Sequence, residues 1–344
     1  MINYRDFNEL DLFNFSDFWN ISDYDENPET QSPSHSPLDA SLVLTLATYA
    51  LTMAVGVPGN VAVMWVTCRN PRTGPSAVFF LHLAAADLAY CLTLPCQAAN
   101  LALHGTWPRS LALCKLLPCT IMLNMFASVF LLTLVSADRC TAIIAPFWSL
   151  RHRTPCLAHW ACSLAWLLAC LMCLPSLLTR KVAFTIYGLK CSIDYSGTLF
   201  GLRTKTVVEV SRVVFAFGLP MLVIAICYLL VGLQLWGRHI SRPLRLATTV
   251  VAAFMVCWLP YHACGLALAF ATQPPSIAWD HATVALASFN SALNPLLYVF
   301  AGHNFCQVLS RSLTTSLRMA FAEERPSNSC SSRRATTFNV EATV

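Results

Sequence analysis

Charged residues are scarce in this chain. Asp, Glu, Lys and Arg make up 11% of its 344 residues, hydrophobic residues make up 56%, and the mean hydropathy is +0.57. A soluble domain carries about 25% charged residues, so this composition excludes a soluble protein of this length. The formal net charge of +5 does not indicate nucleic-acid binding, because the charges are divided between regions and form no single basic patch.

Seven long segments contain almost no charge. A bilayer core requires about 20 apolar residues of helix, and only helices or closed barrels satisfy every backbone polar group there. The segments show no strict alternation of polar and apolar residues, which favours helices. We therefore predict an all-α membrane protein, a seven-transmembrane helix bundle within residues 40–302. Its spans come from the segment around Asp87 and from the runs Ala40–Cys68, Leu116–Ala137, Thr154–Thr179, Val213–Gly237, Leu246–Trp279 and His281–Ser310.

Residues 1–39 lack both an apolar run and basic charge. Arg5 is the only Lys or Arg among many acids, so we predict no cleavable signal peptide and a disordered segment. Asn14 and Asn20 open Asn-X-Ser triplets, which are glycosylated only outside the cytoplasm. Arginines gather in alternate loops, which predicts a multi-pass membrane protein with an extracellular N-terminus. Five cations fall on the outer side and need another role: Arg180, Lys181, Lys190, Arg203 and Lys205.

Several signals of other classes are missing. No Cys and His spacing is typical of a metal site or an enzyme, and no internal repeat indicates a transporter. Most of the 16 Cys lie in apolar runs, where Cys behaves as a small hydrophobic residue. Cys114 lies at the outer end of the third run and Cys191 in the long loop after the fourth. We expect these two to form a disulfide in an oxidising compartment.

Polar residues inside the runs carry the main functional signal. A charge at the bilayer centre costs about 2.5 to 3.5 kcal/mol, so Asp87 should face partners inside the bundle. Asn60 and the Asn294-Pro295-Leu296-Leu297-Tyr298 segment lie at comparable depth. One interpretation is a purely structural hydrogen-bond network in which Pro295 produces a kink. The other is a signalling element.

Further motifs favour signalling. Asp138-Arg139 closes the third run, Trp166 lies in the fourth, Tyr228 follows Pro220 by eight residues, and Trp258-Leu259-Pro260 interrupts the sixth. With these motifs the chain resembles the rhodopsin-like G-protein-coupled receptors over all seven spans. The last run contains no Lys, which excludes an opsin, and we expect no enzymatic activity.

The resemblance implies a role for each motif. Asp138 would hold Arg139 at rest and release it to the G protein, and Trp258 would sense ligand. Tyr228 and Tyr298 would move inward as the sixth span moves about Pro260. An allosteric sodium ion, the one cofactor implied, would bind Asp87, Asn124, Ser128, Asn290 and Asn294. Cys140 departs from the family, which usually has Tyr at this position.

Other segments resemble the chemoattractant branch, and within it the complement anaphylatoxin receptors, above all those for the fragment of the fifth component. These segments are Gly105–Pro108, Leu123–Ser128, Cys191–Ser196 and Trp258–Tyr261. The resemblance implies a basic protein ligand ending in Arg. The N-terminus would bind its body through Asp23, Tyr24 and Asp25, with sulfation at Tyr4 and Tyr24. Its C-terminal Arg would contact Arg180, Arg212, Tyr261 and Asp280, with the arginines on the carboxylate.

Alternatives remain at several of these positions. One alternative is that the acidic segment only keeps a disordered tail solvated, and another is that Arg180 extends to the membrane interface. Lys205 replaces an acid of the mammalian receptors, so formyl-peptide and chemerin receptors stay open, as does a decoy that does not signal. Retention of Arg139 favours signalling.

The C-terminal region completes the prediction. Residues 303–321 form an amphipathic pattern that predicts an eighth helix on the membrane surface. Residues 322–344 predict a disordered cytoplasmic tail, and the resemblance implies inhibitory-type G protein and arrestin as partners. Phosphorylation, which adds negative charge, is expected at Ser327, Ser329, Ser331, Ser332, Thr336 and Thr337.

Overall fold

The computed structural model describes residues 40–69, 74–103, 111–185, 188–193, 202–236, 242–270 and 276–301. The predicted N-terminal segment, surface helix and C-terminal tail lie outside these residues. Helices dominate the described part. They are α1 (Ala40–Arg69), α2 (Pro75–Cys91), α3 (Leu94–Ala102), α4 (Leu111–Ile144), α5 (Pro146–His152), α6 (Pro155–Thr179), α7 (Leu202–Val213), the π-helix η2 (Val214–Gly218), α8 (Leu219–Gln234), α9 (Arg242–Phe270) and α10 (Ile277–Ala301).

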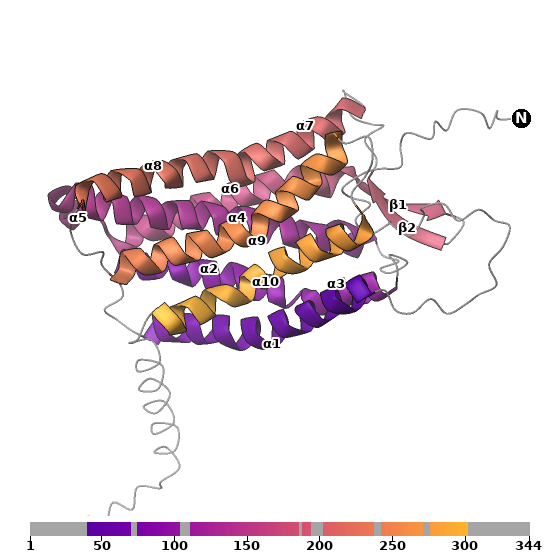
Figure 1. Ribbon diagram of the computed structural model, residues 1–344, viewed down its shortest axis with the longest axis horizontal. Helices are drawn as coiled ribbons and strands as arrows, with labels where there is room; N and C mark the ends of the chain where they lie inside the picture. Colours follow the sequence, from indigo (N-terminus) through magenta and orange to yellow (C-terminus); the bar gives the residue numbers. More distant parts are fainter. Residues whose placement is uncertain are drawn as a thin grey trace, which may run out of the picture.

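The predicted seven-helix bundle is confirmed. Six helical units in the described residues are long and apolar enough to cross a membrane: Ala40–Arg69, Pro75–Ala102, Leu111–Ile144, Pro155–Thr179, Thr206–Gln234 and Leu244–Ala267. The seventh span is α10, whose 25 residues extend roughly 37 Å at about 1.5 Å per residue. It packs between α1 and α9, and the long helices lie side by side along one axis (Figure 1).

Prolines set several helix boundaries. Pro75, Pro146 and Pro155 each lie in the first turn of a helix, where a missing N–H costs nothing. The second span is broken between α2 and α3 near Pro95, and Thr93 Oγ1 donates to the Tyr90 carbonyl at 2.7 Å. In the fifth span, the π-helix η2 precedes Pro220. Such bulges are frequent at functional sites because they re-aim the side chains before them.

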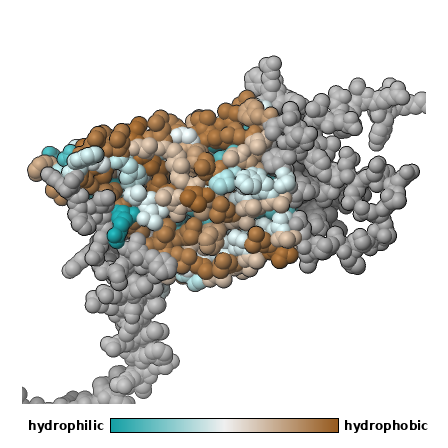
Figure 2. All heavy atoms as spheres, viewed as in Figure 1, coloured by the Kyte–Doolittle hydropathy of each residue, from teal (hydrophilic) through white to brown (hydrophobic). Residues whose placement is uncertain are grey.

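Apolar side chains cover the outside of the bundle. Large hydrophobic residues such as Trp160 and Leu178 are mostly exposed, whereas Asn60, Asp87 and Asn294 are buried. Figure 2 shows hydrophobic residues along most of the length of the visible face. This inverted arrangement fits a bilayer, because lipid solvates apolar side chains while polar groups find partners inside.

A β-hairpin closes one end of the bundle, and the sequence did not predict it. Strands β1 (Arg180–Thr185) and β2 (Gly188–Ile193) pair antiparallel, with Val182 opposite Cys191. The predicted disulfide is confirmed: Cys114 of α4 is bonded to Cys191 of β2, with their Cα atoms 5.5 Å apart. The bond ties the hairpin to α4, and Figure 1 shows the hairpin at the end of the bundle opposite α5.

Candidate ligand pocket and signalling residues

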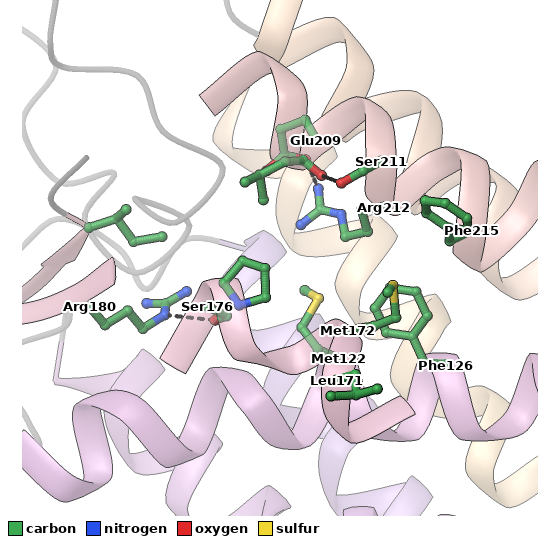
Figure 3. A pocket seen from close by; sticks show the side chains of 13 residues that line it. Met122, Phe126, Leu171, Met172, Ser176, Arg180, Glu209, Ser211, Arg212 and Phe215 are labelled. Carbon is green, nitrogen blue, oxygen red and sulfur yellow. Dashed lines mark hydrogen bonds and ion pairs between the residues drawn. The ribbon is translucent and has the colours of Figure 1, made fainter. Parts of the chain in front are cut away.

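A cavity lies next to the hairpin, between α4, α6 and the fifth span. Its volume is about 140 Å³. Most of the lining is apolar, but two arginines and a glutamate reach it from opposite sides (Figure 3). The lining residues are Met122, Phe126, Leu171, Met172, Pro175, Ser176, Arg180, Ile193, Val208, Glu209, Ser211, Arg212 and Phe215. An enclosed apolar site with a few charged groups is typical of a ligand pocket.

Arg212 carries an ion pair that sequence reasoning missed. Its guanidinium binds the carboxylate of Glu209, one turn earlier on α7, and both side chains are buried. The Arg212 guanidinium carbon also lies 5.7 Å from the centre of the Tyr261 ring. The signal was present in the sequence, since Glu209 and Arg212 have the (i, i+3) spacing of helical ion pairs.

Arg180 lies at the junction of α6 and β1. Its Nε donates to Ser176 Oγ at 3.3 Å, and its Nη1 lies 4.0 Å from the Cys191 sulfur. The residue is only 5% exposed, so in this structure it does not extend to the interface. The structure therefore brings two predicted ligand-contacting residues, Arg180 and Arg212, to one cavity.

Asp280 lies apart from this cavity, on α10. Its Oδ1 is 3.7 Å from the Cys264 sulfur, and the residue is 2% exposed. Oδ2 is buried and accepts no hydrogen bond within the described residues. A buried carboxylate oxygen without a donor is costly, and a cationic donor would satisfy it. Tyr261, whose ring is next to the Arg212 guanidinium, is buried as Asp280 is.

The predicted sensor Trp258 lies deeper in α9. Its indole is buried, with ring centroids 5.4 Å from Tyr261 and 5.9 Å from Phe254. Tyr261 therefore touches both the Arg212 guanidinium and the Trp258 ring. Pro260 lies inside α9 between these two aromatic residues. A displacement of Tyr261 would therefore change its ring contact with Trp258.

The five residues of the predicted sodium site come from α2, α4 and α10, and all are buried. Asn294 Nδ2 donates to Asp87 Oδ2 at 2.7 Å, and Asn124 Nδ2 donates to Ser291 Oγ at 3.1 Å. Four buried oxygens have no hydrogen-bond partner among the described residues: Asp87 Oδ1, Asn124 Oδ1, Ser128 Oγ and Asn290 Oδ1. One carboxylate with hydroxyl and amide oxygens is a donor set that suits a hard cation.

Asp138 and Arg139 lie near α5, at the end of the bundle opposite the hairpin. Arg139 Nη2 lies 2.7 Å from Asp138 Oδ2, as the resemblance implied. Two contacts were not predicted: Arg153 Nε donates to Asp138 Oδ1 at 2.5 Å, and Ser76 Oγ donates to Oδ2 at 2.9 Å. Cys140 and Tyr228 pack in the same region, in a small cluster with Val231.

Several predicted site residues lie outside the described part of the chain. They are Tyr4, Asn14, Asn20, Asp23, Tyr24, Asp25, Ser327, Ser329, Ser331, Ser332, Thr336 and Thr337. Tyr298 and Lys205 lie in α10 and α7, but their side chains are not described. Their predicted roles stay predictions.

Comparison with known proteins decides the family. Residues 59–298 match the 7 transmembrane receptor (rhodopsin family). The chain belongs to this family. It is therefore a multi-pass membrane receptor and not an enzyme, as predicted.

Its relatives include anaphylatoxin chemotactic receptors. The chain is 39% identical over 297 residues to C5a anaphylatoxin chemotactic receptor 1 of Oryctolagus cuniculus, covering 83% of this chain and 84% of the relative. The protein of that name in Homo sapiens is 36% identical over 331 residues, covering 92% and 93%. The C3a anaphylatoxin chemotactic receptor of Danio rerio is 36% identical over 287 residues, covering 82% and 78%. The predicted likeness to anaphylatoxin receptors is confirmed.

Proposed function

We propose that this chain is a plasma-membrane receptor, N-terminus outside, for a complement anaphylatoxin, and that the fragment of the fifth component is its ligand. Binding would activate an inhibitory-type G protein in chemotaxis and inflammation. The observation that carries the proposal is the charge arrangement near the hairpin. Two buried arginines reach one cavity, and Asp280, outside the cavity lining on α10, has a buried carboxylate oxygen with no hydrogen-bond partner among the described residues.

This arrangement suits a peptide that ends in arginine. Such an end presents a carboxylate and a guanidinium close together, and both need a partner of opposite charge in a desolvated site. Arg212 and Arg180 would bind the carboxylate, and Asp280 would bind the guanidinium. The apolar lining, including Met122 and Phe126, would pack against the preceding side chains.

Glu209 adds a condition to this binding mode. Because Glu209 already pairs with Arg212, a ligand carboxylate must share or displace that partner. The pair keeps a buried guanidinium from being left without a counter-charge in the unliganded receptor, which would be strongly unfavourable. Glu209 would therefore weaken ligand binding while stabilising the unliganded receptor.

The signal would pass along α9. A ligand that moves Arg212 or Asp280 would displace Tyr261, whose ring meets that of Trp258 edge to face. Movement of α9 about Pro260 would then open the α5 end and release Arg139 from Asp138 to the G protein. Tyr228 and Tyr298 would move inward in the same transition. Packed helices with two discrete arrangements transmit such changes.

The four open oxygens around Asp87 support sodium as an allosteric ion. Asp87, Asn124, Ser128, Asn290 and Asn294 would hold it in the resting receptor. The ion supplies a positive charge that balances the buried carboxylate.

The segments beyond the described residues would complete the binding and its regulation. Asp23, Tyr24 and Asp25 would attract the basic body of the ligand, and sulfation of Tyr4 and Tyr24 would strengthen this attraction. Glycans would attach at Asn14 and Asn20. The tail serines and threonines would recruit arrestin once phosphorylated.

Two variants test the ligand pocket. Arg212→Gln should lower the affinity of a peptide with a free C-terminal carboxylate by about tenfold or more, the loss expected for one charge-assisted contact. An amidated peptide should be almost unaffected. Asp280→Asn should weaken both peptides when they end in Arg and neither when they end in norleucine, as measured by competition binding.

Lys181→Gln is the matched control, because Lys181 is exposed and adjacent to Arg180. It should change neither affinity by more than about twofold, as expected for an exposed charge. Equal losses for the acid and the amide with Arg212→Gln would contradict the carboxylate assignment.

The fragment of the third complement component is the second candidate ligand. The relatives in Danio rerio and Oncorhynchus mykiss, both named C3a anaphylatoxin chemotactic receptor, are 36% identical to this chain, close to the values for the C5a receptors. Competition between the two fragments for the same chain decides between them. Binding without G protein activation would favour a decoy, and binding of neither fragment would favour formyl peptides or chemerin.

A further inference from the structure

The carboxylate of Asp138 is shared by two arginines. Arg153 Nε lies 2.5 Å from Oδ1 and its Nη2 lies 2.8 Å from Oδ2. Arg139 reaches only Oδ2, with Nε at 3.2 Å and Nη2 at 2.7 Å. Arg153 therefore makes a bidentate contact with the carboxylate, the geometry in which arginine–carboxylate pairs are strong.

Ser76 of α2 joins this cluster. Its hydroxyl donates to Asp138 Oδ2 at 2.9 Å and accepts from Arg153 Nη2 at 2.5 Å. Arg153 follows the last residue of α5, and its backbone N–H donates to the Ser149 carbonyl at 3.0 Å. The position of Arg153 is therefore fixed by α5 and α2 and does not depend on Arg139.

The charges in this cluster do not balance. One carboxylate stands against two guanidiniums, and the side-chain exposures are 6% for Asp138, 16% for Arg139 and 25% for Arg153. The Nη2 atoms of Arg139 and Arg153 both bond to Asp138 Oδ2, at 2.7 and 2.8 Å, so the two cations lie close together and repel each other. Arg153 therefore weakens the hold of Asp138 on Arg139 even in the resting arrangement.

Arg153 matters more once Arg139 has left Asp138. A buried carboxylate that loses its only counter-charge is strongly destabilised. With Arg153 in place, Asp138 keeps a bidentate partner and the Ser76 hydroxyl after Arg139 has left. We propose that Arg153 is a positioning residue for Arg139, which keeps Asp138 paired during activation and so lowers the free energy needed to release Arg139. The inference rests on the proposed signalling function.

The test measures G protein activation by the full chain in membranes, with and without anaphylatoxin. Arg153→Gln should lower basal nucleotide exchange and raise the half-maximal agonist concentration by about tenfold, equivalent to about 1.4 kcal/mol. Arg153→Lys should give an intermediate effect, because lysine keeps the positive charge but cannot bond to both carboxylate oxygens as arginine does. In an Asp138→Asn background, Arg153→Gln should have no effect, because no carboxylate remains to be balanced.

Arg151→Gln serves as the matched control. Arg151 is two residues away and exposed, so its replacement makes the same change in net charge without touching Asp138. It should leave basal exchange and agonist potency at the wild-type values.

A readout without G protein separates this inference from the proposed function. A fluorophore on Arg245→Cys, near the exposed start of α9, would report the opening of the α5 end. Cys68, Cys156 and Cys170, which are exposed among the described residues, are first replaced by Ser. Cys306 and Cys330, which lie outside the described residues, are replaced as well. Arg153→Gln should shift this probe toward the closed form even if no G protein responds.

Higher basal activity in Arg153→Gln would overturn the proposal, because Arg153 would then be part of the restraint on Arg139. An unchanged probe signal, or an equal effect in the Asp138→Asn background, would overturn it as well. A wild-type chain that activates no G protein, while its probe still shifts in Arg153→Gln, would contradict the proposed function alone.

Discussion

At the scale of single residues, Glu209 determines how Arg212 is used. The two side chains form a buried ion pair one turn apart on α7, so under the proposed binding mode a ligand carboxylate would compete with Glu209 for one guanidinium. Glu209→Gln should therefore raise the affinity of a peptide ending in a free carboxylate by about fivefold, which is about 1 kcal/mol. The amidated peptide provides the comparison, because its affinity should not change.

Competition binding on purified receptor measures this effect. The same variant should lower the thermal midpoint of the unliganded receptor, because Arg212 loses its buried counter-charge. A lower affinity for the carboxylate peptide in Glu209→Gln would mean that Glu209 supports ligand binding and does not oppose it.

Asp87 is the second residue with a testable consequence. If sodium binds the open oxygens in the resting receptor, sodium should lower agonist affinity relative to choline at equal ionic strength. We expect a factor of about five or more, the lower end of common allosteric coupling. Asp87→Asn should abolish the difference between the two salts, because the charged ligand of the ion is lost.

Ser136→Ala is a suitable control for this measurement. Ser136 is buried in α4, but its hydroxyl donates to the Leu132 carbonyl at 2.8 Å and does not belong to the proposed site. It should retain the full sodium effect. Equal sodium sensitivity in wild type and Asp87→Asn would contradict the site.

At the scale of helices, the packing of α1 against α10 depends on a glycine. A Cβ atom on Gly59 would lie 2.7 Å from Cβ of Pro295, and the proline ring cannot rotate away. Gly59→Ala should destabilise the receptor by about 1 to 3 kcal/mol, the usual cost of overpacking. The thermal midpoint in detergent, measured with a thiol-reactive or intrinsic fluorescence signal, reports this loss.

Gly232→Ala in α8 is the matched variant. No atom lies within 4 Å of a Cβ built on Gly232, and alanine favours a helix by up to about 1 kcal/mol relative to glycine. Its midpoint should stay constant or rise. If both variants lower the midpoint equally, close packing at Gly59 is not the cause.

The helices themselves could be predicted from the sequence, because lipid imposes a simple rule on length and charge. The hairpin β1–β2 was not predicted, although the disulfide at Cys191 was. Its two strands are short and lie in a loop between spans, where the rule of length and charge says nothing about local structure. The role of Arg153 could not be predicted either. Its contact with Asp138 joins residues that are 15 apart and on different elements, and no local pattern encodes such a pairing.

The candidate site could be predicted only where its residues are adjacent in the sequence. Asp138 and Arg139 are adjacent and form a recognisable motif, whereas the separation of Asp280 from the cavity of Arg180 and Arg212 depends on how α6, α7 and α10 pack. Motif positions indicated which residues matter. Only the packed bundle shows which of them share a cavity and which are already paired.

At the scale of the whole molecule, charged residues lie at both ends of the bundle, and buried aromatic and polar residues lie between them. The cavity lined by Arg180 and Arg212 includes Ile193 of the hairpin. Arg139 pairs with Asp138, whose other arginine partner Arg153 directly follows α5. Figure 1 shows the hairpin and α5 at opposite ends of the bundle. Tyr261, Trp258 and the polar residues around Asp87 occupy the interior between them. Membership of the rhodopsin family and the anaphylatoxin-receptor relatives agree with a receptor that transmits a signal across the membrane.

We expect an anaphylatoxin ending in Arg to switch this receptor to its signalling form. The most direct measurement is inhibition of cAMP in cells expressing the chain, dosed with the fifth-component fragment either intact or lacking its C-terminal Arg. We predict strong inhibition by the intact fragment and a potency at least about tenfold lower without the Arg, a loss of about 1.4 kcal/mol. Equal potency of the two forms, or binding with no change in cAMP, would contradict this account.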